Sequence, residues 1–376
     1  MDKVIGSHYL MPPTAASERT RMTPDHSAEQ RSRRRAIAAW LFGICAMVFV
    51  MVVLGGLTRL TDSGLSMVDW RPITGWLPPM DAAAWERAFE AYRATPEYQK
   101  INRGMSLDEF QGIFWLEFVH RLWGRIIGVA FALPFAVFLL KGWVDRPLGL
   151  RLALLFVLGG GQGMLGWWMV KSGLIDRPDV SQYRLMAHLM LALVVMAYGL
   201  WTALALWHGA GRTEQSVTAQ SAAAHRVRPL ATGLLALVFV TAASGALVAG
   251  LDAGLTYNTF PLMDGEWLPA GLFEPPPAWR AAFEDVMTVQ FDHRVLATAT
   301  LIGVLTLAVL GRRWGLQGRA ARALDWMAVM VVAQASLGIA TLLLAVPISL
   351  AALHQAGAVV LLMLAVWLRR ELADPA

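Results

Sequence analysis

The sequence predicts an all-α integral membrane protein with eight transmembrane helices, arranged as two tandem, pseudo-symmetric four-helix bundles. Three observations lead to this fold class: an apolar composition, eight long apolar runs and an internal duplication. Of the 376 residues, 56% are hydrophobic and only 16% are charged, whereas a soluble domain has about 25% charged residues. This deficit of charge indicates that much of the chain lies in lipid.

Eight apolar runs are each long enough to cross the roughly 30 Å hydrocarbon core of a bilayer as a helix. They cover residues 36–57, 116–140, 150–170, 183–207, 229–250, 290–311, 324–345 and 349–369. The single cysteine, Cys45, lies in the first run. An intrachain disulfide, a CxxC site and covalent haem attachment are therefore excluded.

Basic residues gather before the first run, after the last run and in every second connection. They are Arg31, Arg33, Arg34, Arg35, Lys141, Arg146, Arg151, Arg212, Arg226, Arg228, Arg312, Arg313, Arg319, Arg322, Arg369 and Arg370. With eight spans they share one side, which the positive-inside rule makes cytoplasmic. We expect a multi-pass protein of the bacterial inner membrane with both termini in the cytoplasm. The net charge of +5 then needs no nucleic-acid partner.

Four motifs occur twice, in the same order. Arg59–Ser66 corresponds to Ala249–Thr256, Trp76–Pro78 to Trp267–Pro269, Glu117–Arg121 to Gln290–Arg294, and Gln162–Gly166 to Gln334–Gly338. Each half holds four spans, so the halves have the same orientation, as parallel repeats do. We expect a disordered cytoplasmic tail at 1–35, a first half at 36–210, a cytoplasmic linker at 211–228 and a second half at 229–370.

Four of the eight histidines lie near the outer ends of the spans that run inward: His120, His188, His293 and His354. An ionisable residue inside a span is costly and marks a functional site. Two imidazoles from facing helices are a common axial pair for haem iron in a bundle core, whereas zinc or copper would recruit carboxylates or thiolates. One bis-histidine haem site in each half is the simplest interpretation, and packed histidines are the alternative.

Arg121 and Arg294 directly follow two of these histidines. Guanidinium groups bind carboxylates well, so both are candidates to bind haem propionates at the outer surface. Arg59, Arg125 and Arg184 are further candidates. The alternative for each is snorkelling to the interface.

The halves differ at one position beside the histidines. Glu117 lies three residues before His120, on the same helical face, and Gln290 lies three residues before His293. A carboxylate can act as acid, base or charge stabiliser, and an amide cannot. We therefore expect a catalytic first half and an electron-transferring second half. The alternative is that Glu117 is an interfacial residue with no chemistry.

The Glu117–Arg121 motif, the runs Leu60–Ser66 and Trp70–Gly75 and the duplicated histidines resemble the haem A synthase family. The resemblance covers about residues 36–370 and is closest to the branch found in mitochondria and many Gram-negative bacteria. Other branches carry pairs of outer-loop cysteines, which this chain lacks.

The resemblance implies that the C8 methyl group of haem O becomes the formyl group of haem A, by successive hydroxylations and loss of water from a geminal diol. It implies that His293 and His354 hold a haem b cofactor, that His120 and His188 flank the substrate haem, and that Glu117 is catalytic. Haem O would come from haem O synthase, and haem A would serve haem-copper oxidases. An electron-transfer partner and a homo-oligomer are further expectations.

Two other functions fit parts of the sequence. A di-haem electron-transfer protein of the cytochrome b561 type explains four histidines but not the difference between Glu117 and Gln290. It would also place haems on opposite sides of the membrane, whereas all four histidines here share one side. A haem transporter or chaperone explains one site better than two.

The arginine clusters predict the topology. Residues 1–35 and 371–376 should face the cytoplasm, and the loops 58–115 and 251–289 should face the opposite side. Single cysteines, introduced after replacement of Cys45, can be tested with a membrane-impermeant thiol reagent. We expect labelling from outside only in the two loops, and outside labelling at 212–228 would contradict the predicted topology.

Overall fold

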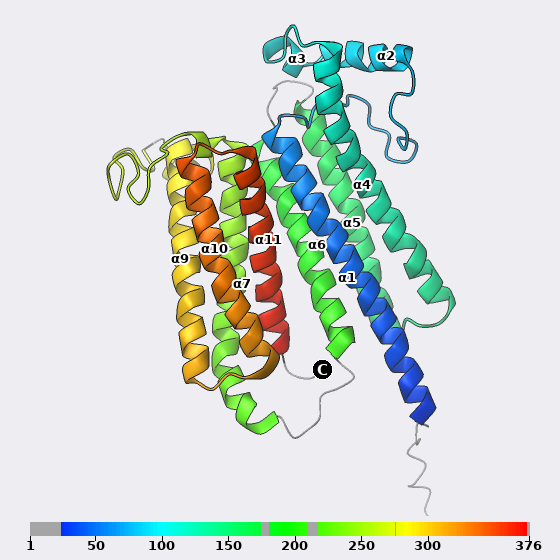
Figure 1. Cartoon of the computed structure of the whole chain (residues 1–376), viewed down its shortest axis with the longest axis vertical. Coiled ribbons are helices and arrows are strands. Elements are labelled where there is room, and N and C mark those ends of the chain that lie inside the picture. The colour runs from blue at the N-terminus through cyan, green and yellow to red at the C-terminus, as the bar shows by residue number, and fades with distance from the viewer. Residues whose placement is uncertain (1–23, 174–179, 209–216, 275, 374–376) are drawn as a thin grey trace, which may run out of the picture.

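The computed structural model describes residues 24–173, 180–208, 217–274 and 276–373, and these are helical except for connecting loops and one isolated β-bridge (Figure 1). Eight helices are long and apolar enough to cross a membrane. They are α1 (Pro24–Leu60), α4 (Leu107–Leu140), α5 (Arg146–Gly173), α6 (Gln182–His208), α7 (Val217–Gly250), α9 (Val286–Arg313), α10 (Gly318–Leu343) and α11 (Ile348–Glu371). The all-α membrane fold and each of the eight predicted spans are confirmed.

Several helices begin earlier than the sequence suggested, and α1 and α7 do so by the most, at 12 residues each. Residues 24–35, expected in a disordered tail, form the first turns of α1, where Arg33 pairs with Glu29 one turn away at 2.5 Å. Residues 217–228, expected in a linker, open α7 and include several alanines, which favour helix. Both extensions are polar, so hydropathy alone ends the helices too early. The rest of the expected tail, residues 1–23, and the rest of the expected linker, residues 211–216, lie outside the described residues.

The helices of each half pack in the same cyclic order. In the first half α1 and α5 each contact α4 and α6, and in the second half α7 and α10 each contact α9 and α11. The halves meet through α6 against α7 and α11, and through α1 against α11. Helix α1 begins and α11 ends at the same end of the molecule (Figure 1). Corresponding helices thus have corresponding neighbours, and the pseudo-symmetry of the two bundles stays a prediction.

The apolar core fills the inner part of both bundles. It is one continuous cluster that includes Leu41, Leu152, Leu200, Met327 and Leu362. Every buried member on a histidine-bearing helix lies inward of that helix's histidine. The outer part of each bundle, around the histidines, is therefore left for other groups.

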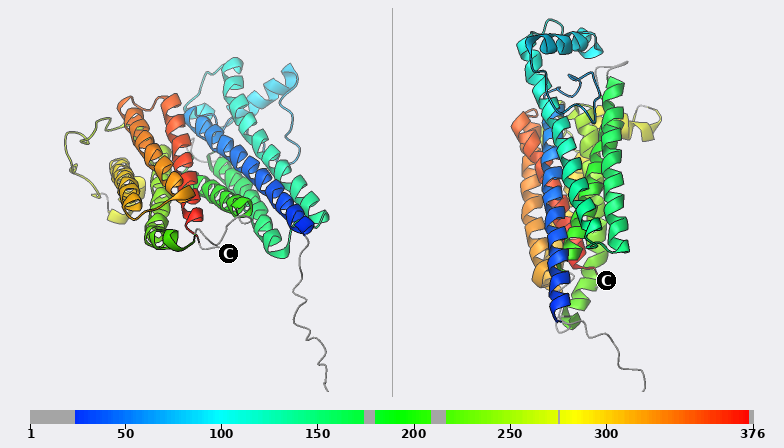
Figure 2. Two further views of the ribbon diagram at one scale, coloured as in Figure 1. Left: turned by 60° about the horizontal axis from the view of Figure 1, so that its bottom comes forward. Right: turned by 90° about the vertical axis from the view of Figure 1, so that its right-hand side faces the viewer.

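Short helices outside the spans were not predicted. Helices α2 (Ala82–Arg93) and α3 (Pro96–Lys100) lie beyond the outer ends of the other helices, as Figure 1 and the right view of Figure 2 show. They pack on the extended outer end of α4 through a cluster of aromatic rings, with Phe89, Tyr92 and Phe110 buried. In the second half, the outer loop carries the short helices η2 (Ala253–Leu255) and α8 (Ala278–Glu284).

Candidate functional site

Each of the four predicted histidines lies against a glycine of a neighbouring helix. A Cβ atom built on that glycine would lie close to the imidazole Cε1, at 3.4 Å for Gly55 and His120, 3.2 Å for Gly166 and His188, 3.1 Å for Gly245 and His293, and 2.7 Å for Gly338 and His354. The missing side chains therefore create the room that the rings occupy.

These glycines lie at matched positions of the internal duplication. Gly55 and Gly245 each lie four residues before the start of the first repeated motif, and Gly166 and Gly338 each end the last one. Sequence reasoning used the second pair only to align the halves and missed the first. Extending the alignment four residues upstream would have found Gly55 and Gly245, because both halves keep glycine there.

The preceding helix also holds each histidine of α6 and α11 through a glutamine. The Gln162 side chain donates to the backbone carbonyl of His188 at 2.8 Å, and the Gln334 side chain donates to that of His354 at 2.8 Å. The two halves thus position these histidines by the same contact.

The halves differ in what lies beside the imidazole Nδ1 atoms. In the second half, Ser244 Oγ lies 2.9 Å from Nδ1 of His293, and Gln334 Nε2 lies 3.1 Å from Nδ1 of His354. In the first half, Thr58 Oγ1 lies 3.5 Å from Nδ1 of His120, and Nδ1 of His188 has no hydrogen-bond partner among the described residues. A metal-ligating imidazole donates its other ring N–H. The hydroxyl of Ser244 can accept that hydrogen bond from His293, whereas the amide nitrogen of Gln334 is itself a donor, so His293 is the ring held most firmly in the orientation of a ligand.

The second pair has the spacing of an axial haem pair. The ring centroids of His293 and His354 are 6.5 Å apart, with the ring planes at 89°. An imidazole nitrogen binds a metal at about 2 Å and lies roughly 1 Å from its ring centre, so two rings on one iron have centroids about 6 Å apart. Within the described residues, no group of three or more His, Cys, Asp or Glu side chains could hold a metal ion. Two facing imidazoles fit haem iron, which takes its other ligands from the porphyrin.

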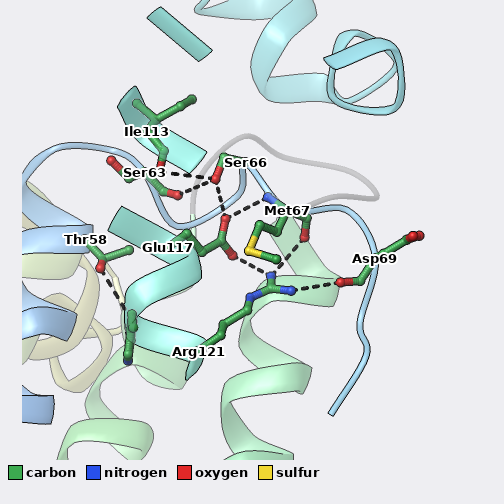
Figure 3. Close-up of polar contacts among 9 residues, drawn as sticks. Thr58, Ser63, Ser66, Met67, Asp69, Ile113, Glu117 and Arg121 are labelled. Carbon is green, nitrogen blue, oxygen red and sulfur yellow. Dashed lines mark hydrogen bonds and ion pairs between the residues drawn. The ribbon is translucent and has the colours of Figure 1, made fainter. Parts of the chain in front are cut away.

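Glu117 is buried and binds the loop that follows α1 (Figure 3). Its Oε2 accepts hydrogen bonds from Ser66 Oγ at 2.6 Å and from the Met67 backbone N–H at 2.7 Å. Its Oε1 pairs with Arg121 Nη2 at 2.5 Å. The hydrogen bonds of the carboxylate therefore go to this loop and to Arg121, and none of them goes to His120.

Arg121 holds the same loop through backbone carbonyls. It donates to the carbonyl oxygens of Met67 at 2.9 Å and Asp69 at 3.0 Å (Figure 3). Its guanidinium also lies 5.0 Å from the ring centre of Trp70. The expected contact with a propionate stays a prediction, since these donors are engaged by the protein.

The second half repeats this arrangement with one change of chemistry. Arg294 donates to the carbonyls of Tyr257 at 2.7 Å and Thr259 at 2.8 Å, which the duplication matches to Met67 and Asp69. Gln290 donates to the carbonyls of Ala253 and Thr256, both at 2.6 Å, and accepts from Arg294 at 2.8 Å. Glu117 thus accepts hydrogen bonds from its loop, whereas Gln290 donates them.

The other three candidate arginines bind elsewhere in the protein. Arg59 pairs with Asp252 of the second half at 2.8 Å. Arg125 donates to the carbonyl of Arg71 at 2.6 Å, and the Arg184 guanidinium lies 4.3 Å from the ring centre of Trp168. Of the remaining histidines, His208 lies 3.0 Å from Glu371. His8 lies outside the described residues, and so does the side chain of His26.

Several known proteins are similar to this chain over most of its length. A family model described as cytochrome oxidase assembly protein matches residues 38–366. The chain is 49% identical to a heme A synthase of Nitrosospira multiformis, over 94% of this chain and 98% of that protein. It is 50% identical to one of Parvibaculum lavamentivorans, over 91% and 96% of the two chains. It is 46% identical to heme A synthase COX15 of Arabidopsis thaliana, over 90% and 75%.

The close approach of Gly338 to His354 predicts that adding a methyl group at position 338 will weaken haem binding. In Gly338→Ala the new Cβ would lie 2.7 Å from the imidazole, so the ring or the helix must move. Misplacing a ligand in this way should weaken haem binding to the second half by about 10–100-fold. The haem content of purified protein measures this. Gly233→Ala is the matched control, since nothing lies within 4 Å of its Cβ. Normal haem content in Gly338→Ala would contradict the assignment.

Proposed function

This chain belongs to the family of cytochrome oxidase assembly proteins that includes the heme A synthases, and we propose that it is itself a haem A synthase that oxidises the C8 methyl group of haem O to a formyl group. The observation that carries the proposal is the pair of glycine-backed histidine sites, one of which has a carboxylate where the other has an amide. Identity near 50% over most of the chain to heme A synthases supports it.

We assign the resident haem b to the second half. His293 and His354 have the spacing of an axial pair, and Ser244 Oγ can accept a hydrogen bond from Nδ1–H of His293, which leaves Nε2 of that ring for the metal. Firmly oriented ligands suit a cofactor that stays bound, because such contacts raise metal affinity. When bound, the haem would accept and pass on electrons.

We assign the substrate haem to the first half, between His120 and His188. There the nearest contact at Nδ1 of His120 is 3.5 Å, and Nδ1 of His188 has no hydrogen-bond partner among the described residues. Less firmly oriented ligands suit a haem that must enter as haem O and leave as haem A. The histidines hold and orient the substrate, and the loop held by Arg121 lies on the outer side of this site.

Glu117 is the residue that we propose to handle protons. Its carboxylate lies one turn before His120, and the Ser66 hydroxyl is in contact with it at 2.6 Å. The serine can turn its hydroxyl away, which leaves an acceptor position free on the carboxylate. Gln290 has no such capacity, since an amide does not take up a proton at neutral pH. This contrast supports turnover in the first half alone.

The proposed reaction implies partners for the enzyme and a location in the cell. With water as the source of the oxygen, conversion of a methyl group to a formyl group releases four electrons and four protons, so the protein needs an electron-transfer partner that accepts the electrons. Haem O synthase would supply the substrate, and haem-copper oxidases would take the product. The eight spans place the protein in a membrane. The bacterial inner membrane, with both termini in the cytoplasm, is the location that the arginine clusters favour.

The assignment of haem b predicts a low-spin spectrum. Purified protein should show b-type absorption bands, because His293 and His354 fill both axial positions. Replacing either residue by alanine should abolish that signal, while alanine at the surface residue His225 should not. Retention of the full low-spin spectrum in both variants would refute the assignment.

The role of Glu117 predicts a loss of turnover without loss of the cofactor. Glu117→Gln removes the charge and the proton acceptor, and acid or base catalysis commonly contributes about 10²–10⁴-fold to a rate. We expect a loss in that range, with haem O or its alcohol accumulating while the b-type spectrum persists. Chromatography of extracted haems gives the measurement.

A control separates proton handling from support of the loop. The amide introduced by Glu117→Gln would turn its hydrogens toward the Met67 N–H, so part of any loss could come from the loop. Ser66→Ala removes one loop contact but keeps the carboxylate, and we expect it to lose far less activity than Glu117→Gln. Equal losses in the two variants would make Glu117 a support for the loop. Haem A formation at the parental rate in Glu117→Gln would remove its catalytic assignment.

A further inference from the structure

One face of α5 is packed at its inner end, bound to the histidine site at its outer end, and open between them. The face consists of residues spaced three or four apart: Leu152, Leu155, Gly159, Gln162 and Gly166. Leu152 and Leu155 are buried in the apolar core. Gln162 and Gly166 contact His188. Because both ends of the face point into the bundle, Gly159 does so too, yet nothing lies within 4 Å of its Cβ position and it is exposed.

The second half has no such opening. The duplication matches the face to Leu324, Met327, Val331, Gln334 and Gly338 on α10. Val331 takes the place of Gly159 and is 3% exposed, in the same apolar core as Leu324 and Met327. The same position is thus filled by a buried side chain in one half and left open in the other.

Helix α4 shows the same difference. Gly128 is exposed and has nothing within 4 Å of its Cβ position. The duplication matches it to Leu301, which packs against the apolar core. At about 1.5 Å per residue, Gly128 lies about 18 Å from the inner end of α4 and Gly159 about 20 Å from the inner end of α5. The two open positions are therefore at the same depth, and we call the space beside them the glycine-lined space.

A haem ring does not explain this space. The proposed function places a haem in both halves, but only the first half is open here. Gly159 also lies about 10 Å deeper than Gly166, which contacts His188. The helix backbone exposed at glycine has its polar groups bonded within the helix, so the walls of the space are apolar.

We propose that the glycine-lined space holds the isoprenoid chain of the substrate haem, an inference that rests on the proposed function. Haem O differs from haem b by a hydroxyethylfarnesyl group on the edge of the macrocycle away from the propionates. With the propionates at the polar outer surface, that chain points inward, toward Gly128 and Gly159. The second half binds a haem without such a chain, and there Val331 and Leu301 fill the volume.

Gly159→Val tests the proposal, because it copies the second half. The full-length protein, with its second-half haem in place, is titrated with haem O and with haem B, and first-half binding is followed by absorbance. We expect the parent to prefer haem O. In Gly159→Val the affinity for haem O should fall by at least about tenfold, since overfilling a packed site is costly, and the affinity for haem B should not change.

Gly233→Val is the matched control. It makes the same change at an exposed glycine of the second half, with nothing within 4 Å of its Cβ position, and should keep the preference for haem O. Should Gly159→Val lose the second-half spectrum and thus its fold, Gly128→Leu replaces it with the same expected results.

Three outcomes would overturn the proposal: a parent without preference for haem O, a Gly159→Val variant that keeps the preference, or one that loses both haems equally. A lipid acyl chain in the space has the same chemistry as the isoprenoid but would give the first of these results. The two proposals can also fail separately. If the parent prefers haem O and Gly159→Val does not, but the parent fails to oxidise haem O, the isoprenoid site is upheld and the proposed function is refuted.

Discussion

The outer half of the protein depends on the requirement that polar groups near lipid find their partners within the protein. Each half meets this requirement with two residues one helical turn apart, Glu117 and Arg121 in the first half and Gln290 and Arg294 in the second. Both pairs bind the backbone of a loop at the loop end of their bundle. Because the histidine lies between these two positions in sequence, the same turn of helix positions both the loop and the histidine ring. The loops are thus part of the sites and not merely connections between spans.

The duplicated framework provides two matched sites whose chemistry differs, as the proposed function requires. The glycines behind the histidines and the glutamines that bind their backbones are the same in both halves. The differences are single residues at matched positions, such as Glu117 with Gln290 and Gly159 with Val331. Each exchanges one local property, the polarity of a hydrogen bond or the filling of a volume. Such changes leave the helix packing intact, and the chemistry can diverge on an unchanged scaffold.

Hydropathy and the repeat predicted the spans, the histidine pairs and the asymmetry at Glu117. They did not predict that α1 extends back to Pro24, because a helix outside the membrane carries no apolar signal. They missed α2 and α3, which lie outside the apolar runs. For α2 the sequence does hold a signal, since Asp81 caps the helix and Trp85, Phe89 and Tyr92 follow at helical spacing. The partners of Glu117 were also missed. Ser66 and Met67 lie about 50 residues away in the chain, and only the folded structure brings them to the carboxylate.

The continuous apolar core beneath both sites has an electrical consequence. The helix segments that build this core, such as residues 41–57, 131–140, 189–204 and 296–311, carry no Asp, Glu, Lys, Arg or His. Such a layer is an insulator, since a charge crossing it would lose its hydration. In the proposed reaction, protons formed at the histidine sites would therefore leave at the end of the bundles where the loops lie. An oxidation at these sites would then leave the electrical potential across the membrane unchanged.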